Sequence, residues 1–206
     1  MRIVCLLIGY CCGCVLIADL VARARTGKPA REFGTKNPGT VNVTEQLGAV
    51  AGGITLFGDC MKVVIAYVLC RFFVAPDLGQ LCALWAGLGA TLGHDFPFWT
   101  RFHGGIGVAT TCATIILFSP TWGWLALVTG FIVAAVSQQL SVAAITLTVV
   151  FVPIAGMLNG WEAALLALAF VVLMISKNTH EIYGVYKGTQ PKTDVIGNLR
   201  KLFRRS

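Results

Sequence analysis

The sequence has 206 residues, of which 56% are hydrophobic and only 12% are charged, and its mean hydropathy is +0.77. This composition excludes an ordinary soluble globular protein, because the stretches between apolar segments leave no room for a soluble domain of useful size. We therefore expect one membrane-embedded domain over residues 1–206, with a short basic tail at 193–206.

Apolar segments follow one another along almost the whole chain, and a membrane-spanning helix needs roughly 20 mostly apolar residues. The candidate spans lie near residues 3–22, 47–74, 78–93, 106–119, 121–137, 140–157 and 161–177. The fourth and fifth are short, and a re-entrant pair is the alternative interpretation of them. The predicted fold class is an all-α polytopic helix bundle with about seven transmembrane helices.

Basic residues gather after the first span and after the last. They are Arg23, Arg25, Lys28, Arg31 and Lys36, and then Lys177, Lys187, Lys192, Arg200, Lys201, Arg204 and Arg205. Because positive charges near span ends tend to stay cytoplasmic, we expect the amino terminus outside and the carboxyl terminus in the cytoplasm. The net charge of +7 then reflects topology and anionic lipid headgroups, and it gives no support to nucleic-acid binding.

The first polar segment that lipid does not explain is GTKNPGTVNV at 34–43. Asn37 before Pro38 favours an extended conformation, and Gly39 after it suits the positive φ of a type II turn. We therefore expect a tight polar loop whose hydroxyl, ammonium and amide groups face a polar or phosphorylated ligand. An ordinary connecting turn is the alternative.

The second polar segment, GHDFPFWTRFHGGIGVAT at 93–110, contains His94, His103 and three glycines that lead into the next apolar helix. Backbone N–H groups of Gly104, Gly105 and Gly107 are expected to converge on an anion, helped by the positive end of the helix dipole. Glycine is also common in membrane helices for close packing, which is the alternative.

The third polar segment, NTHEIYGVYKGTQPK at 178–192, brings His180 and Glu181 to the end of the last span. A histidine beside a carboxylate can transfer a proton or orient a hydroxyl, although a solvated helix end is the simpler account. Inside the second span, Asp59 and Lys62 share one helical face, and their opposite charges lower the cost of burying either one. Eight scattered cysteines are interpreted as small packing residues, since none stands at metal-ligand spacing from a histidine.

Together the three segments resemble the bacterial acyl-phosphate-dependent glycerol-3-phosphate acyltransferases. That family has a first loop SGNxGATN, a second GHxFPxxxxFKGGKGVAT and a third ENxxRxxxGxExK. The second loop agrees at Gly93, His94, Phe96, Pro97, Phe102, Gly104, Gly105, Gly107, Val108, Ala109 and Thr110. In the first loop Asn37, Gly39 and Asn42 agree, and Thr35 stands where the family has Ser.

The resemblance implies transfer of a fatty acyl group from acyl phosphate to the 1-hydroxyl of glycerol 3-phosphate, without a metal or other cofactor, in a bacterial inner membrane with the site facing the cytoplasm. The predicted catalytic residues are His94, from the matching second loop, and His180 and Glu181, from the histidine beside a carboxylate in the third segment. The residues that the resemblance implies for substrate binding are Thr35, Lys36, Asn37, Gly39, Asn42, Glu45, His103, Gly104, Gly105, Gly107 and Ser141.

The departures from the family pattern fall on charged positions. Glu45 stands where the family has Arg, and His103 and Ile106 replace its two lysines in the second loop. In the third segment Glu181, Gly184 and Gln190 replace Asn, Arg and Glu. Lys36, in place of Gly, is the best compensating cation. Two alternatives stay open: a non-catalytic relative that binds a lipid or a membrane partner, and a small transporter.

Overall fold

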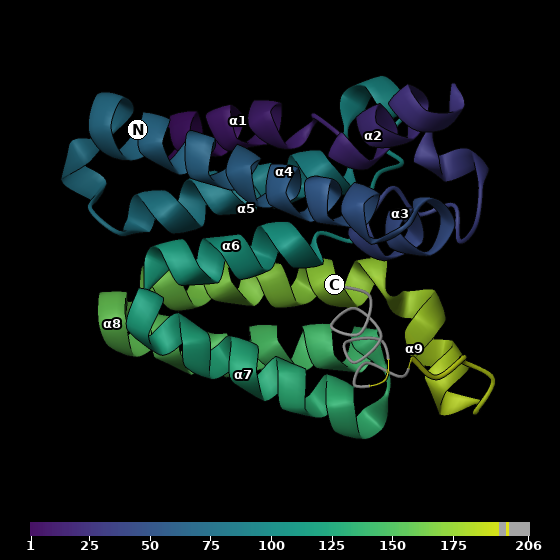
Figure 1. Cartoon of the computed structure of the whole chain (residues 1–206). Helices are drawn as coiled ribbons and strands as arrows, with labels where there is room; N and C mark the ends of the chain where they lie inside the picture. Colours follow the sequence, from purple (N-terminus) through teal and green to yellow (C-terminus); the bar gives the residue numbers. More distant parts are fainter. Residues whose placement is uncertain (194–196, 198–206) are drawn as a thin grey trace. The chain divides into compact units, whose positions relative to one another are not determined.

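The structure is a computed structural model that describes residues 1–193 and Gly197, so the predicted tail at 193–206 lies almost entirely outside the described residues. Within the described part, all regular secondary structure is helical (Figure 1), which confirms the all-α expectation. The chain forms two compact units, Met1–Ser119 and Pro120–Ser206, and each is described by itself.

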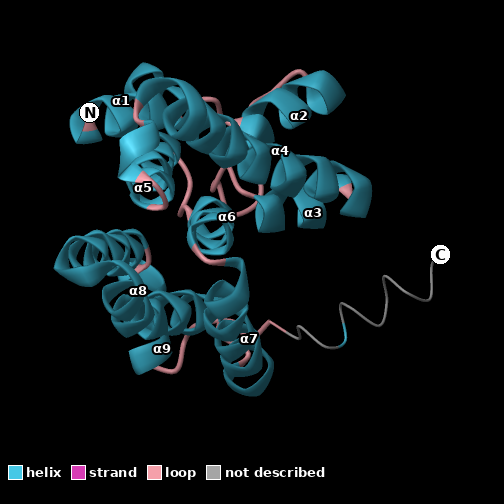
Figure 2. Cartoon of the chain, turned by 90° about the vertical axis from the view of Figure 1, so that its left-hand side faces the viewer, coloured by secondary structure: helices cyan, strands magenta, loops and turns pink. Residues whose placement is uncertain are grey.

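The first unit is a bundle in which α5 contacts α1, α4 and α6 (Figure 2). Its helices are α1 (Arg2–Gly13), α2 (Ile17–Thr26), α3 (Thr40–Leu47), α4 (Ala49–Val68), α5 (Leu81–Asp95) and α6 (Val108–Phe118). A π-helical stretch, Leu69–Val74, continues α4, and 3₁₀ turns occur at Ala30–Glu32, Pro76–Leu78 and Phe98–Thr100.

Helices α1 and α5 touch through their backbones, because each carries two glycines four residues apart on the shared face. A Cβ added at Gly9 or Gly13 would lie 2.0 or 2.1 Å from a carbonyl oxygen of α5. In return, a Cβ at Gly89 or Gly93 would lie 2.0 or 2.2 Å from a carbonyl oxygen of α1. Paired small residues at this spacing are the usual way in which membrane helices approach closely.

The second unit contains α7 (Pro120–Ser137), α8 (Leu140–Lys177) and α9 (Thr179–Tyr186). The long helix α8 is interrupted, since Asn159 and Gly160 have non-helical dihedral angles and Gly160 has a φ of 72°. The two halves fold back on each other, with a Cβ at Gly156 falling 3.2 Å from the Cβ of Ala164. The interruption therefore separates the segments 140–157 and 161–177 that the sequence predicts as two spans.

Four stretches are long and apolar enough to cross a membrane: Arg2–Thr26, Ala49–Val74, Pro120–Ser137 and Leu140–Lys177. Val108–Phe118 is a shorter apolar helix. The chain is therefore a multi-span membrane protein by length and composition, while the number seven and the orientation of the termini stay predictions. One difference is clear: the first predicted span, 3–22, is two helices, because residues 14–16 leave the helix.

The backbone contact of α1 and α5 makes a stability prediction. Gly89→Ala places a methyl group against the Leu6 carbonyl and should lower the unfolding free energy by about 1–3 kcal/mol, as overpacking does. Gly53→Ala is the matched control, because Gly53 lies on α4 with nothing within 4 Å of its added Cβ. Thermal unfolding in detergent should show a lower midpoint for Gly89→Ala alone; equal midpoints would contradict the contact.

Candidate functional site

The break between α1 and α2 is the point at which the first unit assembles its polar groups. The backbone carbonyls of Gly13, Cys14 and Val15 lie at this break, and burying them without hydrogen-bond donors would cost free energy. Lys62 Nζ donates to the carbonyls of Gly13 and Val15, both at 3.2 Å. Trp99 Nε1 donates to the Cys14 carbonyl at 2.7 Å. Helix α4 and the second loop therefore meet at this break.

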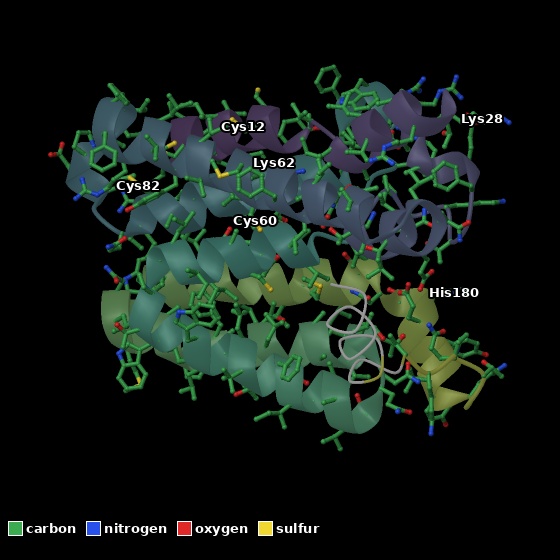
Figure 3. The ribbon with its side chains drawn as sticks, viewed as in Figure 1. Cys12, Lys28, Cys60, Lys62, Cys82 and His180 are labelled. Carbon is green, nitrogen blue, oxygen red and sulfur yellow. The ribbon has the colours of Figure 1, made fainter. Side chains whose placement is uncertain are left out.

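Lys62 is also the centre of a buried cluster of ionisable side chains with Asp59 and His94. Its Nζ lies 2.9 Å from Asp59 Oδ1 and 2.7 Å from His94 Nδ1, and His94 Nδ1 lies 3.6 Å from the same oxygen. All three side chains are at least 95% buried. In Figure 3, Lys62 lies among the helices of the first unit, whereas Lys28 points away from them. The predicted pairing of Asp59 with Lys62 is confirmed, and His94 joins it from the last turn of α5.

Asn42 organises the first loop from its buried position on α3. Its Nδ2 donates to the carbonyls of Ala30, Phe33 and Asn37 at 3.0, 3.3 and 2.9 Å. Its Oδ1 accepts the Thr35 N–H at 3.0 Å. With these four bonds the amide has used its two donors and its acceptor on the protein itself. Asn42 therefore shapes the loop, and its predicted contact with a substrate stays a prediction.

The turn in the first loop differs from the type II turn expected at Gly39. Gly39 has a φ of −135° and precedes α3 in an extended conformation. Positive φ occurs earlier, at Gly34 (56°) and at Lys36 (61°). The reason is that α3 begins at Thr40, so the chain must reverse before Pro38. A left-handed conformation costs a side-chain-bearing residue free energy, and Lys36 adopts it nevertheless.

A second set of contacts ties the first loop to the second. Asp19, buried on α2, accepts the Ala30 N–H at 3.0 Å and forms an ion pair with Arg31. The Arg31 guanidinium carbon in turn lies 5.5 Å from the centre of the Trp99 ring. Sequence reasoning missed Asp19 and Trp99. The signal available was a single carboxylate in the first span, for which an inward partner is the usual explanation.

The backbone N–H groups of Gly104 and Gly105 in the second loop were expected to be available to an anion, but they donate to backbone carbonyls of the protein. Gly104 N–H donates to the Asp95 carbonyl at 3.1 Å and Gly105 N–H to the His94 carbonyl at 3.0 Å. Glycine is required there for space: a Cβ would lie 2.0 Å from His94 O at position 104 and 2.1 Å from His94 Nε2 at position 105. These two N–H groups are therefore bonded within the protein, close packing accounts for the glycines, and a role in anion binding stays a prediction.

Gly107 precedes α6 with a φ of 75°, a conformation that favours glycine. A Cβ at this position would lie 2.6 Å from Asp95 Oδ1 and 3.1 Å from Oδ2. The buried carboxylate of Asp95 thus faces the positive end of the α6 dipole. Gly107 is therefore required for space beside the Asp95 side chain, and its role in binding a phosphate stays a prediction.

The remaining predicted residues of the first unit lie on its surface. Thr35, Lys36, Glu45 and His103 are exposed, and Asn37 is half-buried. His103 Nδ1 lies 2.6 Å from the Arg101 carbonyl. These side chains, rather than the buried ones, are available to a soluble substrate. Within the described residues, no group of three or more His, Cys, Asp or Glu is placed to hold a metal ion.

In the second unit, His180 and Glu181 belong to the first turn of α9, with His180 exposed and Glu181 half-buried. Ser141 is buried near the start of α8. The two substituted positions further on lie against each other, since a Cβ at Gly184 would be 2.7 Å from Gln190 Oε1.

The buried cluster predicts a coupled effect on stability. Lys62→Met should lower the unfolding free energy by about 3–5 kcal/mol, because it leaves the Asp59 carboxylate buried without its cation. Adding Asp59→Leu to that variant should recover most of the loss, since no isolated charge remains. A double-mutant cycle by thermal unfolding measures the coupling, and additive losses would show that the two side chains are independent.

The chain matches a family model described as glycerol-3-phosphate acyltransferase over residues 3–188. It is 32% identical to glycerol-3-phosphate acyltransferase 1 of Lactobacillus johnsonii over 196 residues, covering 95% of this chain and 94% of that protein. It is also 32% identical to glycerol-3-phosphate acyltransferase of Burkholderia orbicola over 200 residues, with 95% of this chain and 93% of the relative covered.

The fold has a solved counterpart as well. It is PlsY, described as an integral membrane glycerol 3-phosphate acyltransferase and crystallised in a glycerol 3-phosphate form. The TM-score is 0.82 at 22% identity, with 96% of this chain and 98% of the other covered. Fold, length and sequence agree, and the chain belongs to the glycerol-3-phosphate acyltransferase family.

Proposed function

We propose that this protein is an acyltransferase of phospholipid synthesis, which moves a fatty acyl group from acyl phosphate to the 1-hydroxyl of glycerol 3-phosphate and forms lysophosphatidic acid. The observation that carries the proposal is the family match over residues 3–188, which includes both loops of the first unit. Contacts of Asn42 and His94 shape those loops in this protein.

The chemistry asks little of the protein beyond positioning. Acyl phosphate is a mixed anhydride with a good leaving group, so the enzyme has to hold two anionic substrates, stabilise developing charge and accept a hydroxyl proton. We assign the contact with the anionic groups to the exposed Thr35 and Lys36 of the first loop and to His103 of the second. His180 and Glu181 are the proposed catalytic residues of the second unit.

The basic residues favour a site on the cytoplasmic side of a bacterial plasma membrane. Arg23, Arg25 and Lys28, at and beyond the end of α2, are exposed. Such clusters beside a span tend to remain cytoplasmic and to contact anionic headgroups. The first loop follows this cluster directly, so it would face the same compartment, where both soluble and membrane-bound substrates are present.

The direct test is acyl transfer by the purified protein in detergent. Radiolabelled acyl phosphate, with glycerol 3-phosphate as acceptor, should yield labelled lysophosphatidic acid, and glycerol should react far less because it lacks the phosphate. A panel of other small hydroxyl compounds checks for an altered acceptor. Lipid binding by folded protein without turnover on any acceptor would favour the non-catalytic alternative, which the replaced cations at Glu45 and Ile106 motivate.

Lys36 provides a prediction in which stability and affinity separate. Lys36→Gly removes a charge but relieves a left-handed side chain, so the unfolding midpoint should stay level or rise. The KM for glycerol 3-phosphate should rise about tenfold or more, because a charged hydrogen bond contributes roughly 1.5–3 kcal/mol and 1.4 kcal/mol is a factor of ten.

Lys36→Arg is the matched control, since it keeps both the charge and the backbone constraint. It should retain most of the affinity for glycerol 3-phosphate. An unchanged KM in Lys36→Gly would remove Lys36 from the binding site, whatever its effect on stability.

A further inference from the structure

A continuous series of contacts leads from the first loop towards the second through the peptide group of Ala30. The Ala30 carbonyl accepts a hydrogen bond from Asn42 Nδ2 at 3.0 Å, and the Ala30 N–H donates to Asp19 Oδ1 at 3.0 Å. The other oxygen of the Asp19 carboxylate forms the ion pair with Arg31. Because Asn42 also accepts the Thr35 N–H, Arg31 is linked to the residue that shapes the first loop.

Arg31 is the end of this series that faces the second loop. Its guanidinium carbon lies 5.5 Å from the centre of the Trp99 ring. The Arg31 side chain is 28% exposed, whereas that of Asp19 is only 2% exposed. A guanidinium is planar, stays charged and stacks on an aromatic face, a combination that lysine does not provide. The stacking of Arg31 on Trp99 is therefore a specific junction between two segments that are distant in the sequence.

Trp99 is fixed in place from its own side of the junction. It is the central residue of the 3₁₀ turn Phe98–Thr100, and its Nε1 donates to the Cys14 carbonyl at 2.7 Å. The turn itself is closed by the Pro97 carbonyl, which accepts the N–H of Phe102 at 3.1 Å. The Trp99 side remains 48% exposed even so. The ring is therefore a stable surface that the Arg31 side chain can contact or leave.

We propose that Arg31 and Trp99 form a latch, defined as this stacked pair, which holds the first loop against the second and thereby sets the affinity for glycerol 3-phosphate. Both are positioning residues. The assignment rests on the proposed function, which gives contacts with anionic groups to Lys36 of the first loop and to His103 of the second. A substrate that contacts both loops binds more tightly when their spacing is already fixed, because less ordering is needed on binding.

The latch limits its own effect on affinity. The apparent affinity of a ligand falls with the fraction of molecules that are in the binding arrangement. Breaking a cation–π contact should therefore raise KM for glycerol 3-phosphate by about two- to thirtyfold, which is the factor that corresponds to the free energy of such a contact. Saturating substrate brings the loops together by itself, so kcat should stay nearly unchanged.

Arg31→Lys is the direct test, because lysine keeps the positive charge beside Asp19 and loses the stacked plane. We expect the rise in KM with kcat retained and with a similar unfolding midpoint. A purely structural role would instead lower the midpoint and kcat while KM stayed level. Arg25→Lys makes the same exchange at an exposed arginine of α2 and should leave KM unchanged.

Trp99→Leu removes the same contact from the other side. Its unfolding midpoint should also fall, because the Cys14 carbonyl loses a donor, so kinetics are compared at a temperature where every variant is folded. The double variant Arg31→Lys, Trp99→Leu should have a KM no higher than that of Trp99→Leu, since one contact can be lost only once. Multiplying effects on KM would show that the two residues act independently.

Hydrogen–deuterium exchange of the purified protein in detergent reads the latch without any activity. Arg31→Lys should speed exchange in peptides of the second loop, and Trp99→Leu should speed it in peptides of the first loop, where the Thr35 N–H is bonded to Asn42. Faster exchange confined to the loop that carries each substitution would refute the latch.

An unchanged KM in Arg31→Lys would also overturn the proposal. If the wild type shows no acyl transfer, only the proposed function fails, and calorimetric titration with glycerol 3-phosphate then gives the comparison of affinities. Equal dissociation constants for wild type and Arg31→Lys, or no binding by the wild type, would remove the role in affinity, while the exchange measurement still decides whether the loops are coupled.

Discussion

The first unit depends on the contact between the backbones of α1 and α5. Gly9 and Gly13 of α1 face Gly89 and Gly93 of α5. The two backbones therefore lie so close together that a Cβ added at any of the four glycines would collide with a carbonyl oxygen of the other helix. That distance places the end of α1 beside His94, in the last turn of α5. The contacts of Lys62 and Trp99 depend on this placement, since the break follows α1 and the second loop follows α5.

The polar side chains divide into a buried set that shapes the site and an exposed set that is free to meet substrate. Lys62, Asn42 and Asp19 are buried and use their donors and acceptors on the protein's own carbonyls, amides and charged groups. Lys36 and His103 are exposed at strained turns. Substituting a buried polar residue leaves its partners without hydrogen bonds and costs free energy. An exposed charged residue can instead be replaced by another one a few positions away in the sequence. This division explains why the shaping residues match the family pattern at His94 and Asn42 while several cations do not.

The sequence predicts the helices well because length and apolarity alone define them, and it predicts the pair of Asp59 and Lys62 because a buried charge needs a partner. It does not predict the break at 14–16, since no proline or charge marks it; the break exists because Lys62 and Trp99 supply donors from distant segments. The roles of Gly104 and Gly105 were also beyond its reach. Glycine is favoured both where a neighbouring ring needs space and where a backbone N–H binds an anion. The sequence alone does not separate these two explanations, whereas the structure shows His94 packed against both glycines.

The break between α1 and α2 also constrains how the protein can be assembled. Its carbonyls at Gly13, Cys14 and Val15 obtain their donors from α4 and from the second loop, which are made later. Before α4 and the second loop are in place, the unpaired carbonyls in lipid would cost several kcal/mol of free energy. An unbroken helix is therefore the more stable conformation of Arg2–Thr26 at that stage. The newly inserted segment should therefore cross the membrane as one continuous helix, and it would unwind only when Lys62 and Trp99 dock against it.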